Sequence, residues 1–310
     1  MNKVDLSIII LSYNTKKLTL ETIASLEENY PEEMASGSYE VIVVDNASSD
    51  GSAEALKEYK SKTNIESFHI VANHTNIGFG AGNNKGLSHV KGNYVLFLNP
   101  DTVVHPKTLI YMLHFMNEHP EAGAATCKLE LPSGGMDEAC HRGFPTPWNA
   151  FCHFSGLEKM FPKSRLFSGY LQGWKDLRNI HEVDAVAGAF LLVRREIGEK
   201  IGWWDEDYFF YGEDLQFCYD IGKIGSKIYY VPDVSILHYG GVTSGIKKTS
   251  QDITTADNER RRRVQGYRFD AMRIFYKKNY ANRYPKFVSW LVFQGINFLN
   301  HENLAKLKSV

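Results

Sequence analysis

Residues 6–14 read LSIIILSYN and residues 40–46 read EVIVVDN, and these two stretches decide the fold class. Each is a short run of apolar, largely β-branched residues that ends abruptly in polar ones. Between the two runs, Leu20, Ile23 and Ala24 recur at the i, i+3, i+4 spacing of a helix face. A strand, a helix and a second strand in this order predict a βαβ unit. Because the apolar runs do not alternate with polar residues, they predict a mainly parallel sheet covered on both faces.

The same alternation continues along the chain and predicts an α/β fold, with a Rossmann-like, mainly parallel central sheet flanked by helices. In residues 130–184 the periodicity fades into Gly, Pro and aromatic residues. This segment predicts a long excursion over the carboxyl ends of the strands, where ligands of such sheets bind. The other predicted elements are strands at 68–72, 94–98, 227–231 and 234–238, an ordered segment at 183–193, and helices at 81–90, 106–118 and from Glu213 onward.

The composition is that of an ordinary globular protein, with 310 residues, 43% of them hydrophobic and 23% charged. The apolar run at 6–11 has no cleavage site behind it, and the late apolar run at 290–299 is interrupted by polar residues. A spanning helix needs about 20 apolar residues, so we expect neither a signal peptide nor a membrane span, and a cytoplasmic location. Four cysteines without a Cys-x-x-Cys pair predict free thiols and no zinc site.

Charge is divided unevenly along the chain. Residues 241–310 hold 14 Lys and Arg against 5 Asp and Glu, so this tail carries +9 while the overall net charge is -1. We therefore predict a boundary between a main domain at 1–241 and a basic, largely helical C-terminal region at 242–310. Such a tail is expected to meet an anionic partner. The alternative is a solvated helix that forms a homodimer.

Polar residues at the ends of the early strands are candidates for binding a nucleotide. Asp45 closes the run at 40–46, where a carboxylate can accept hydrogen bonds from a base or ribose; a turn or helix-capping role is the alternative. Residues 76–86 (NIGFGAGNNKG) precede or open a helix, where bare backbone can approach an anion. Their spacing matches neither the P-loop nor the dinucleotide fingerprint, so a plain helix-start turn is the alternative.

Two acidic clusters are candidates for the chemistry itself. Asp101 follows a strand in Asn99-Pro100-Asp101, and a single carboxylate is enough to bind Mg²⁺ when water and phosphate supply the other ligands. Glu213 and Asp214 follow an aromatic run, where partial burial could raise a pKa enough for general-base catalysis. For both clusters a structural role is the alternative, as a turn residue or as acids in the first turn of a helix.

Histidine and aromatic residues supply weaker candidates. His238 ends an apolar strand and could contact a metal or a phosphate. Trp203 and Trp204 could stack on sugar rings, although core packing is the more common role. Within the excursion, His141, Arg142 and Arg178 are candidates for contacts with phosphate or with an acceptor.

Taken together, these motifs resemble glycosyltransferase family 2, and most of all its rhamnosyltransferase-like members. The resemblance covers about residues 5–241. It rests on an ordered set of motifs: 7–14 (SIIILSYN), 43–46 (VVDN), the glycine segment 76–86, Asn99-Pro100-Asp101, 188–190 (GAF), Gly212-Glu213-Asp214 and His238. One departure is the first position of the Asp-x-Asp motif of many members, where this chain has the neutral Asn99.

The resemblance implies a GT-A fold, a nucleotide-diphospho-sugar donor, Mg²⁺ or Mn²⁺ as cofactor, and inversion at the anomeric carbon. It implies that Asp45 contacts the base, that Asp101 and His238 hold the metal, and that Asp214, with Glu213 beside it, takes the acceptor's proton. The donor-binding residues implied in addition are Ser12, Asn14, Asn76, Gly78, Gly80, Asn84 and Asn99. The implied acceptor-binding residues are Gly188, Trp203 and Trp204.

The leading hypothesis is therefore an enzyme that builds cell-surface polysaccharide or lipid-linked oligosaccharide, with dTDP-rhamnose as the first donor to test and UDP-hexoses next. The basic tail would then contact anionic lipid headgroups or the diphosphate of a lipid-linked acceptor at the inner face of the membrane. The alternative is a non-catalytic nucleotide-sugar-binding partner, which Asp101 and Asp214 argue against. A nicotinamide-dependent oxidoreductase is rejected on the glycine spacing, and no nucleic-acid binding is expected from the short run Arg260–Arg263.

Overall fold

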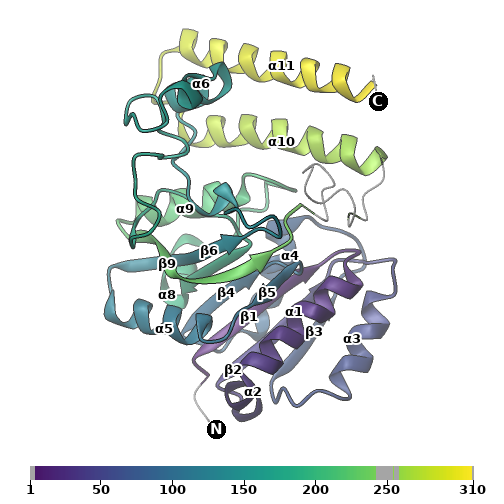
Figure 1. The fold of residues 1–310 in the computed structure, drawn as a ribbon. Coiled ribbons are helices and arrows are strands. Elements are labelled where there is room, and N and C mark those ends of the chain that lie inside the picture. The colour runs from purple at the N-terminus through teal and green to yellow at the C-terminus, as the bar shows by residue number, and fades with distance from the viewer. Residues whose placement is uncertain (1–3, 242–253, 255–257, 309–310) are drawn as a thin grey trace.

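The protein is described by a computed structural model, which covers residues 4–241, 254 and 258–308, with the side chains of 258 and 302–308 left aside. Its centre is one mixed sheet in the order β3-β2-β1-β4-β8-β6-β9-β5, with β7 paired to β9 (Figure 1). The strands are β1 (Leu6–Ser12), β2 (Tyr39–Asp45), β3 (Phe68–Ala72), β4 (Tyr94–Leu98), β5 (Thr102–Val104), β6 (Ala122–Glu130), β7 (His181–Glu182), β8 (Phe190–Arg194) and β9 (Lys227–His238).

The apolar runs recognised in the sequence form the parallel half of this sheet. β1 pairs in parallel with β2 on one side and β4 on the other, and Ile9 lies opposite Ile42 and Phe97. Every residue of β1 and β2 is buried, which explains why their apolar residues do not alternate with polar ones. The strands at 68–72 and 94–98 match the prediction.

Helices flank the sheet, as predicted. They are α1 (Lys16–Asn29), α2 (Pro31–Ser36), α3 (Ser52–Lys60), α4 (Phe79–Gly86), α5 (Thr108–Glu118), α6 (Pro147–Ser155), α7 (Leu157–Met160), α8 (Arg195–Ile201), α9 (Glu213–Lys223), α10 (Asn258–Asn279) and α11 (Lys286–Lys308), with short 3-10 turns at Leu87–His89 and Glu138–Cys140. The helix predicted at 81–90 is thus α4 followed by a 3-10 turn. All four cysteines are buried, with free thiols as predicted.

Parts of the sheet differ from the predicted pattern, and the short strands β5 and β7 have no predicted counterpart. β6 has no predicted counterpart, because its AGAATCKLE sequence carries small residues where the other strands carry branched ones. The strands predicted at 227–231 and 234–238 are one continuous strand, β9. Pro232 falls where the pairing of β6 with β9 shifts register, so the strand passes the proline through a bulge.

The C-terminal region is helical, as predicted, and α10 and α11 lie together beyond the sheet (Figure 1). α10 contacts the main body through Tyr267, whose ring lies 4.6 Å from that of Phe209, and through Lys278, which pairs with Asp205. The predicted domain boundary at 242 lies outside the described residues. None of the described helices is long and apolar enough to cross a membrane.

Candidate active site

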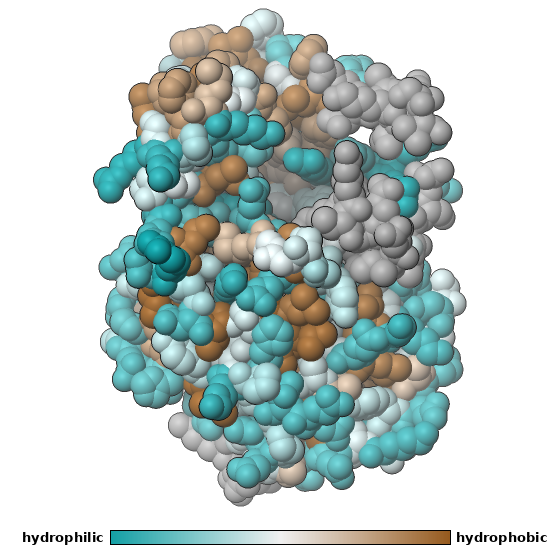
Figure 2. Space-filling view, in the orientation of Figure 1, coloured by the Kyte–Doolittle hydropathy of each residue, from teal (hydrophilic) through white to brown (hydrophobic). Residues whose placement is uncertain are grey.

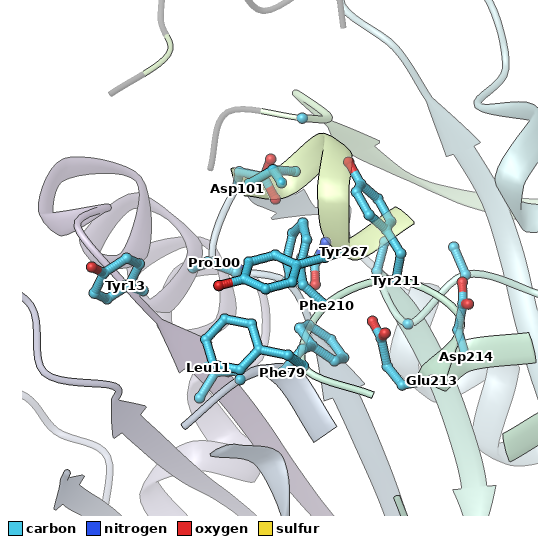
Figure 3. A pocket seen from close by; sticks show the side chains of 18 of the residues that line it. Leu11, Tyr13, Phe79, Pro100, Asp101, Phe210, Tyr211, Glu213, Asp214 and Tyr267 are labelled. Carbon is cyan, nitrogen blue, oxygen red and sulfur yellow. The ribbon is translucent and has the colours of Figure 1, made fainter. Parts of the chain in front are cut away.

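A cavity of about 430 Å³ opens where the carboxyl ends of β1, β2 and β4 meet the end of β9 and the start of α9. Figure 3 shows Asp101 and Tyr13 on one side of this cavity and Glu213 and Asp214 on the other. The position fits the rule that open α/β sheets bind ligands beyond the carboxyl ends of their strands. Of the predicted site residues, those that line the cavity are Asn76, Gly78, Asn99, Asp101, Arg142, Gly188, Glu213, Asp214 and His238.

The first functional cluster joins Asp101 and His238, which are buried against each other. The turn after β4 presents Asp101, and the end of β9 brings Nε2 of His238 to 3.5 Å from Oδ1 of Asp101. Nδ1 of the same ring lies 3.2 Å from Oδ2 of Asp137. Burial opposes the imidazolium, but the two carboxylates more than offset it and raise the pKa of His238 to about 9. This corner of the cavity therefore favours positive charge.

The geometry of Asp101 and His238 fits a divalent metal ion. Two ligands about 2.1 Å from an octahedral ion lie about 3 Å apart, close to the separation of Asp101 Oδ1 from His238 Nε2. One carboxylate oxygen and one imidazole nitrogen suit Mg²⁺ or Mn²⁺, with other positions left to phosphate and water. Within the described part of the chain, no group of three or more His, Cys, Asp or Glu residues is placed to hold an ion by itself. Asp101 and His238 thus fit a metal that the donor helps to bind.

The second cluster lies at the start of α9. Oδ2 of Asp214 accepts a hydrogen bond of 2.6 Å from the guanidinium of Arg142, and both side chains are largely buried. Glu213 is buried beside them, and its Oε2 has no hydrogen-bond partner among the described residues. Burial and the neighbouring Asp214 carboxylate raise the pKa of Glu213 to about 8. The two adjacent acids therefore differ: Asp214 forms an ion pair, whereas Glu213 is kept neutral at pH 7.

Two residues of these clusters, Asp137 and Arg142, come from the excursion at 130–184. Arg142 forms a β-bridge with Ala185, which folds the excursion back over the sheet. The sequence predicts Arg142 only as a contact for phosphate or acceptor and does not indicate Asp137, because no motif or periodicity marks either. The other excursion candidates lie elsewhere: His141 is buried against His181, and Arg178 pairs with Asp176 at the surface.

Asn46, directly after β2, organises the cavity wall at the glycine segment. Its side chain donates to Asn76 Oδ1 and to the carbonyl of Gly78, and accepts from the backbone of Ile77. Tyr13 lines the cavity next to it, with the guanidinium of Arg260 4.5 Å from the ring centroid. Neither Asn46 nor Tyr13 was singled out by the sequence, although both belong to the motifs 43–46 and 7–14.

Three predicted donor-binding residues at the ends of β1 and β2 do not line the cavity. The buried hydroxyl of Ser12 is hydrogen-bonded to Thr15 and Thr19, so a direct donor contact by Ser12 is corrected to a structural role. Asn14 is hydrogen-bonded to the loop at 48–49: its backbone amide donates to the Ser48 hydroxyl, and its Oδ1 accepts from the backbone amide of Ser49. Asp45 is buried at the end of β2, next to Asn46, and accepts from the backbone of Ser48.

The predicted role of the glycine segment, a close approach to phosphate, is also corrected. Most of its glycines approach protein atoms and not an open space for phosphate. A Cβ on Gly78 would lie 2.5 Å from the carbonyl oxygen of Phe209, and a Cβ on Gly82 would lie 2.6 Å from Leu11. Gly80 approaches the backbone of Asp205 in the same way. Asn84 exchanges hydrogen bonds with the backbone of Trp204. Gly80 and Asn84 therefore fasten the segment at 204–209 to α4.

The predicted stacking role of the two tryptophans is wrong for this structure. Trp204 is 2% exposed and packs in the core against Phe97 and Phe217. Trp203 packs on Gly198, where a Cβ would lie 2.1 Å from its ring. Of the predicted acceptor-binding residues, only Gly188 reaches the cavity.

Comparison with known proteins agrees with this architecture. The model of "Glycosyl transferase family 2" matches residues 7–163, and that of "Glycosyl transferase family group 2" matches residues 94–299. The chain therefore belongs to glycosyltransferase family 2, as its motifs indicated. Its fold is the GT-A fold. It superposes on a mannosyltransferase of Pyrobaculum calidifontis that was solved with GDP-Man and Mn²⁺. The TM-score is 0.59 at 16% identity, and the superposition covers 100% of this chain and 74% of the other. GalNAc-T7, solved with UDP, GalNAc and Mn²⁺, gives a TM-score of 0.57 at 16% identity, over 92% and 58%.

Similar proteins of known activity include rhamnosyltransferases. The chain is 27% identical to the rhamnosyltransferase WbbL of Escherichia coli K12, over 52% of this chain and 61% of WbbL. It is 25% identical to the N-acetylglucosaminyl-diphospho-decaprenol L-rhamnosyltransferase of Mycobacterium tuberculosis, over 66% and 68%. The resemblance to rhamnosyltransferase-like members is thereby confirmed as a distant one.

Proposed function

We propose that this protein transfers a sugar from a nucleotide-diphospho-sugar to an acceptor hydroxyl, with inversion, in the synthesis of cell-surface or lipid-linked glycan. The observation that carries the proposal is that Asp101 with His238 and Asp214 with Arg142 face one cavity. A single displacement needs both features: stabilisation of the leaving diphosphate at one side, and a proton acceptor for the attacking hydroxyl at the other. A non-catalytic binding partner would need only the first.

Asp101 and His238 would hold Mg²⁺ or Mn²⁺ together with the diphosphate of the donor. When bound, such an ion supplies positive charge that stabilises the departing diphosphate. The chain's own contribution is to present the Asp101 carboxylate from a turn with little freedom, since Pro100 precedes it and Thr102 begins β5. Asn46 and Asn76 would orient the donor, with Asp45 near the base at the end of β2.

Asp214 is the favoured proton acceptor of the two adjacent acids. A general base must be ionised, and Glu213 is protonated at pH 7 because its pKa is raised to about 8. Asp214 is paired with Arg142 through Oδ2 and still lines the cavity. Arg142 thus orients the carboxylate that would take the hydroxyl proton during in-line attack.

The donor is proposed to be dTDP-rhamnose first and a UDP-hexose next, and the acceptor a glycan or a lipid-linked sugar. Support comes from the rhamnosyltransferase names of WbbL and of the mycobacterial relative, the second of which names a diphospho-decaprenol acceptor. We also propose that residues 1–241 form the catalytic domain. The C-terminal helix α10 adds Arg260 and Tyr267 to the cavity wall.

The test combines binding and turnover. Calorimetric titration with dTDP and UDP, with and without Mn²⁺, should show metal-dependent binding that is lost in Asp101→Ala. Release of dTDP from dTDP-rhamnose, in the presence of an N-acetylglucosaminyl-diphospho-lipid, should fall by about 10²–10⁴ in Asp214→Asn, whereas nucleotide binding persists. Asp220→Asn, on the same helix but bonded to Gln216 and Lys223, is the matched control and should remain active. Near-normal turnover in Asp214→Asn would refute its role as base.

A further inference from the structure

Large apolar side chains lie exposed on two neighbouring segments, away from the cavity. Figure 2 shows them gathered at the upper left of the molecule, over α6 and the first part of α11 in the orientation of Figure 1. We call this surface the apolar patch and define it by residues that are each 45–65% exposed: Trp148, Phe151 and Phe161 of the α6–α7 segment, and Phe287, Trp290 and Leu291 of α11.

α11 has two apolar faces, and only one of them is covered within the described part of the chain. Phe287, Trp290 and Leu291 are spaced by three and four residues, so they share one helix face. On the opposite face, Ile296 is buried and Phe293 packs edge-to-face on Tyr276 of α10, with ring centroids 5.5 Å apart. Packing against α10 therefore explains one face of α11 and leaves the other unexplained.

The α6–α7 part of the patch has a defined arrangement. Trp148 lies 5.8 Å from Phe151 between ring centroids, and its Nε1 donates to the carbonyl of Leu166 at 2.8 Å. The segments that carry the two parts lie near each other, because Asn149 of α6 and Tyr284 at the α10–α11 turn line the same surface cavity. Exposed, contiguous apolar surface of this kind marks a site of protein or membrane contact.

Charge distinguishes between those two partners. In residues 147–167 the exposed charged residues are Lys159, Lys163 and Arg165, since Glu158 is buried and bonded to His153. In residues 281–301, leaving histidine aside, the charged residues are Arg283 and Lys286, both exposed. The apolar patch is therefore bordered by cations on both segments.

We propose that the apolar patch docks on the interface of a lipid bilayer that carries anionic headgroups. Tryptophan and phenylalanine at the depth of the headgroups, with Lys and Arg beside them, are the composition that such an interface binds. A second copy of the chain fits less well, because a twofold dimer places the patch against itself and brings like charges together. This contact differs from the one predicted for the basic tail, since it rests on apolar side chains of two separate segments.

The first experiment is co-sedimentation of the full chain with phosphatidylcholine vesicles, with and without phosphatidylglycerol, at low and high salt. We expect binding to the anionic vesicles that weakens with salt and falls at least about tenfold in Phe287→Ser/Leu291→Ser. Ile110→Ser is the matched control, because Ile110 is 49% exposed on α5, outside the patch, and should bind like the wild type. Unchanged binding in the double variant, or no binding by the wild type, would overturn the proposal.

A second measurement covers the case in which the double variant does not fold. Brominated lipids quench tryptophan fluorescence only at short range, so they should quench the wild type more than Trp290→Phe. Sedimentation velocity without lipid should give a monomer. The proposal would be overturned by a dimer that dissociates in Leu291→Ser and stays intact in Lys159→Glu. That result would assign the patch to a second copy of the chain. Neither readout uses sugar transfer, so failure here is separable from failure of the proposed function.

Discussion

Glu213→Gln should stabilise the fold, and the gain should grow with pH. Glu213 is 6% exposed at the start of α9, with one carboxylate oxygen unpartnered among the described residues. Burial and the Asp214 carboxylate raise its pKa from 4.5 to about 8. In the unfolded chain the same group ionises near its ordinary pKa. Between these two pKa values the unfolded state loses a proton that the folded state keeps, so the stability of the wild type falls as pH rises.

The size of the effect follows from the same two values. One pKa unit corresponds to about 1.4 kcal/mol, so Glu213 lowers the free energy of unfolding by about 3 kcal/mol at pH 7 relative to pH 4.5. Glutamine does not titrate and nearly matches the shape of the acid. The advantage of Glu213→Gln over the wild type should therefore be small near pH 5, reach about 3 kcal/mol at pH 7, and level off above pH 8.

Urea unfolding at several pH values between 5 and 9, followed by circular dichroism, measures this difference. Glu54→Gln is the matched control, because Glu54 is also an acid in the first turn of a helix, α3, but is exposed. It should show no gain that grows with pH. If wild type and Glu213→Gln lose stability in parallel from pH 5 to pH 8, Glu213 is not held neutral, and the preference for Asp214 as base loses its support.

Three further predictions concern the residues that hold the site together. Gly78→Ala should lower the free energy of unfolding in urea by about 3–5 kcal/mol, because its φ of 92° and ψ of 176° lie in a region that essentially only glycine adopts, and its Cβ would meet the Phe209 carbonyl. Gly134→Ala, with a φ of 84° and open space around it, should cost only about 1–2 kcal/mol, and equal losses would contradict the clash. Arg142→Met should lower the free energy of unfolding by about 3 kcal/mol and reduce sugar transfer, since it leaves the Asp214 carboxylate without its counterion. Arg142→Lys should restore part of the stability and part of the transfer. Unchanged turnover in Arg142→Met would show that catalysis does not depend on the ion pair. Trp204→Ala should cost about 3–5 kcal/mol as a core truncation, whereas a rise in acceptor KM without loss of stability would restore the stacking role.

The sequence predicts the parallel half of the sheet well, because buried parallel strands must be continuous apolar runs. β4, whose five residues are all buried, has the predicted bounds for this reason. β6 is not predicted from the sequence, because small residues such as Ala124 and Ala125 have little strand preference. Its conformation is fixed by pairing with β8 and β9 alone. The same limit applies to Asp137 and Arg142. The chain turns back at the end of β6 through the bridge from Glu130 to Met136, which places Asp137, and the bridge from Arg142 to Ala185 places Arg142; no apolar periodicity encodes either contact.

The glycine segment shows a different limit. A glycine is required wherever another atom approaches the backbone closely, and the requirement is the same whether that atom belongs to a phosphate or to the protein. The sequence therefore identified the positions but not their partners. Gly78 meets the backbone of Phe209, and the amide of Phe79 donates to that same carbonyl at 2.8 Å.

These contacts show that the glycine segment holds neighbouring parts of the site in place. Phe209 lies a few residues before Glu213 and Asp214, so its contact with Gly78 joins the glycine segment to the chain that leads into α9. The carbonyl of Gly78 also accepts a hydrogen bond from the Asn46 side chain, which organises the proposed donor side of the cavity. One short loop thus fixes both walls of the site relative to each other. The proposed in-line displacement depends on the distance between the donor carbon and the base, so a rigid link between these walls would serve transfer itself, and donor binding alone would not require it.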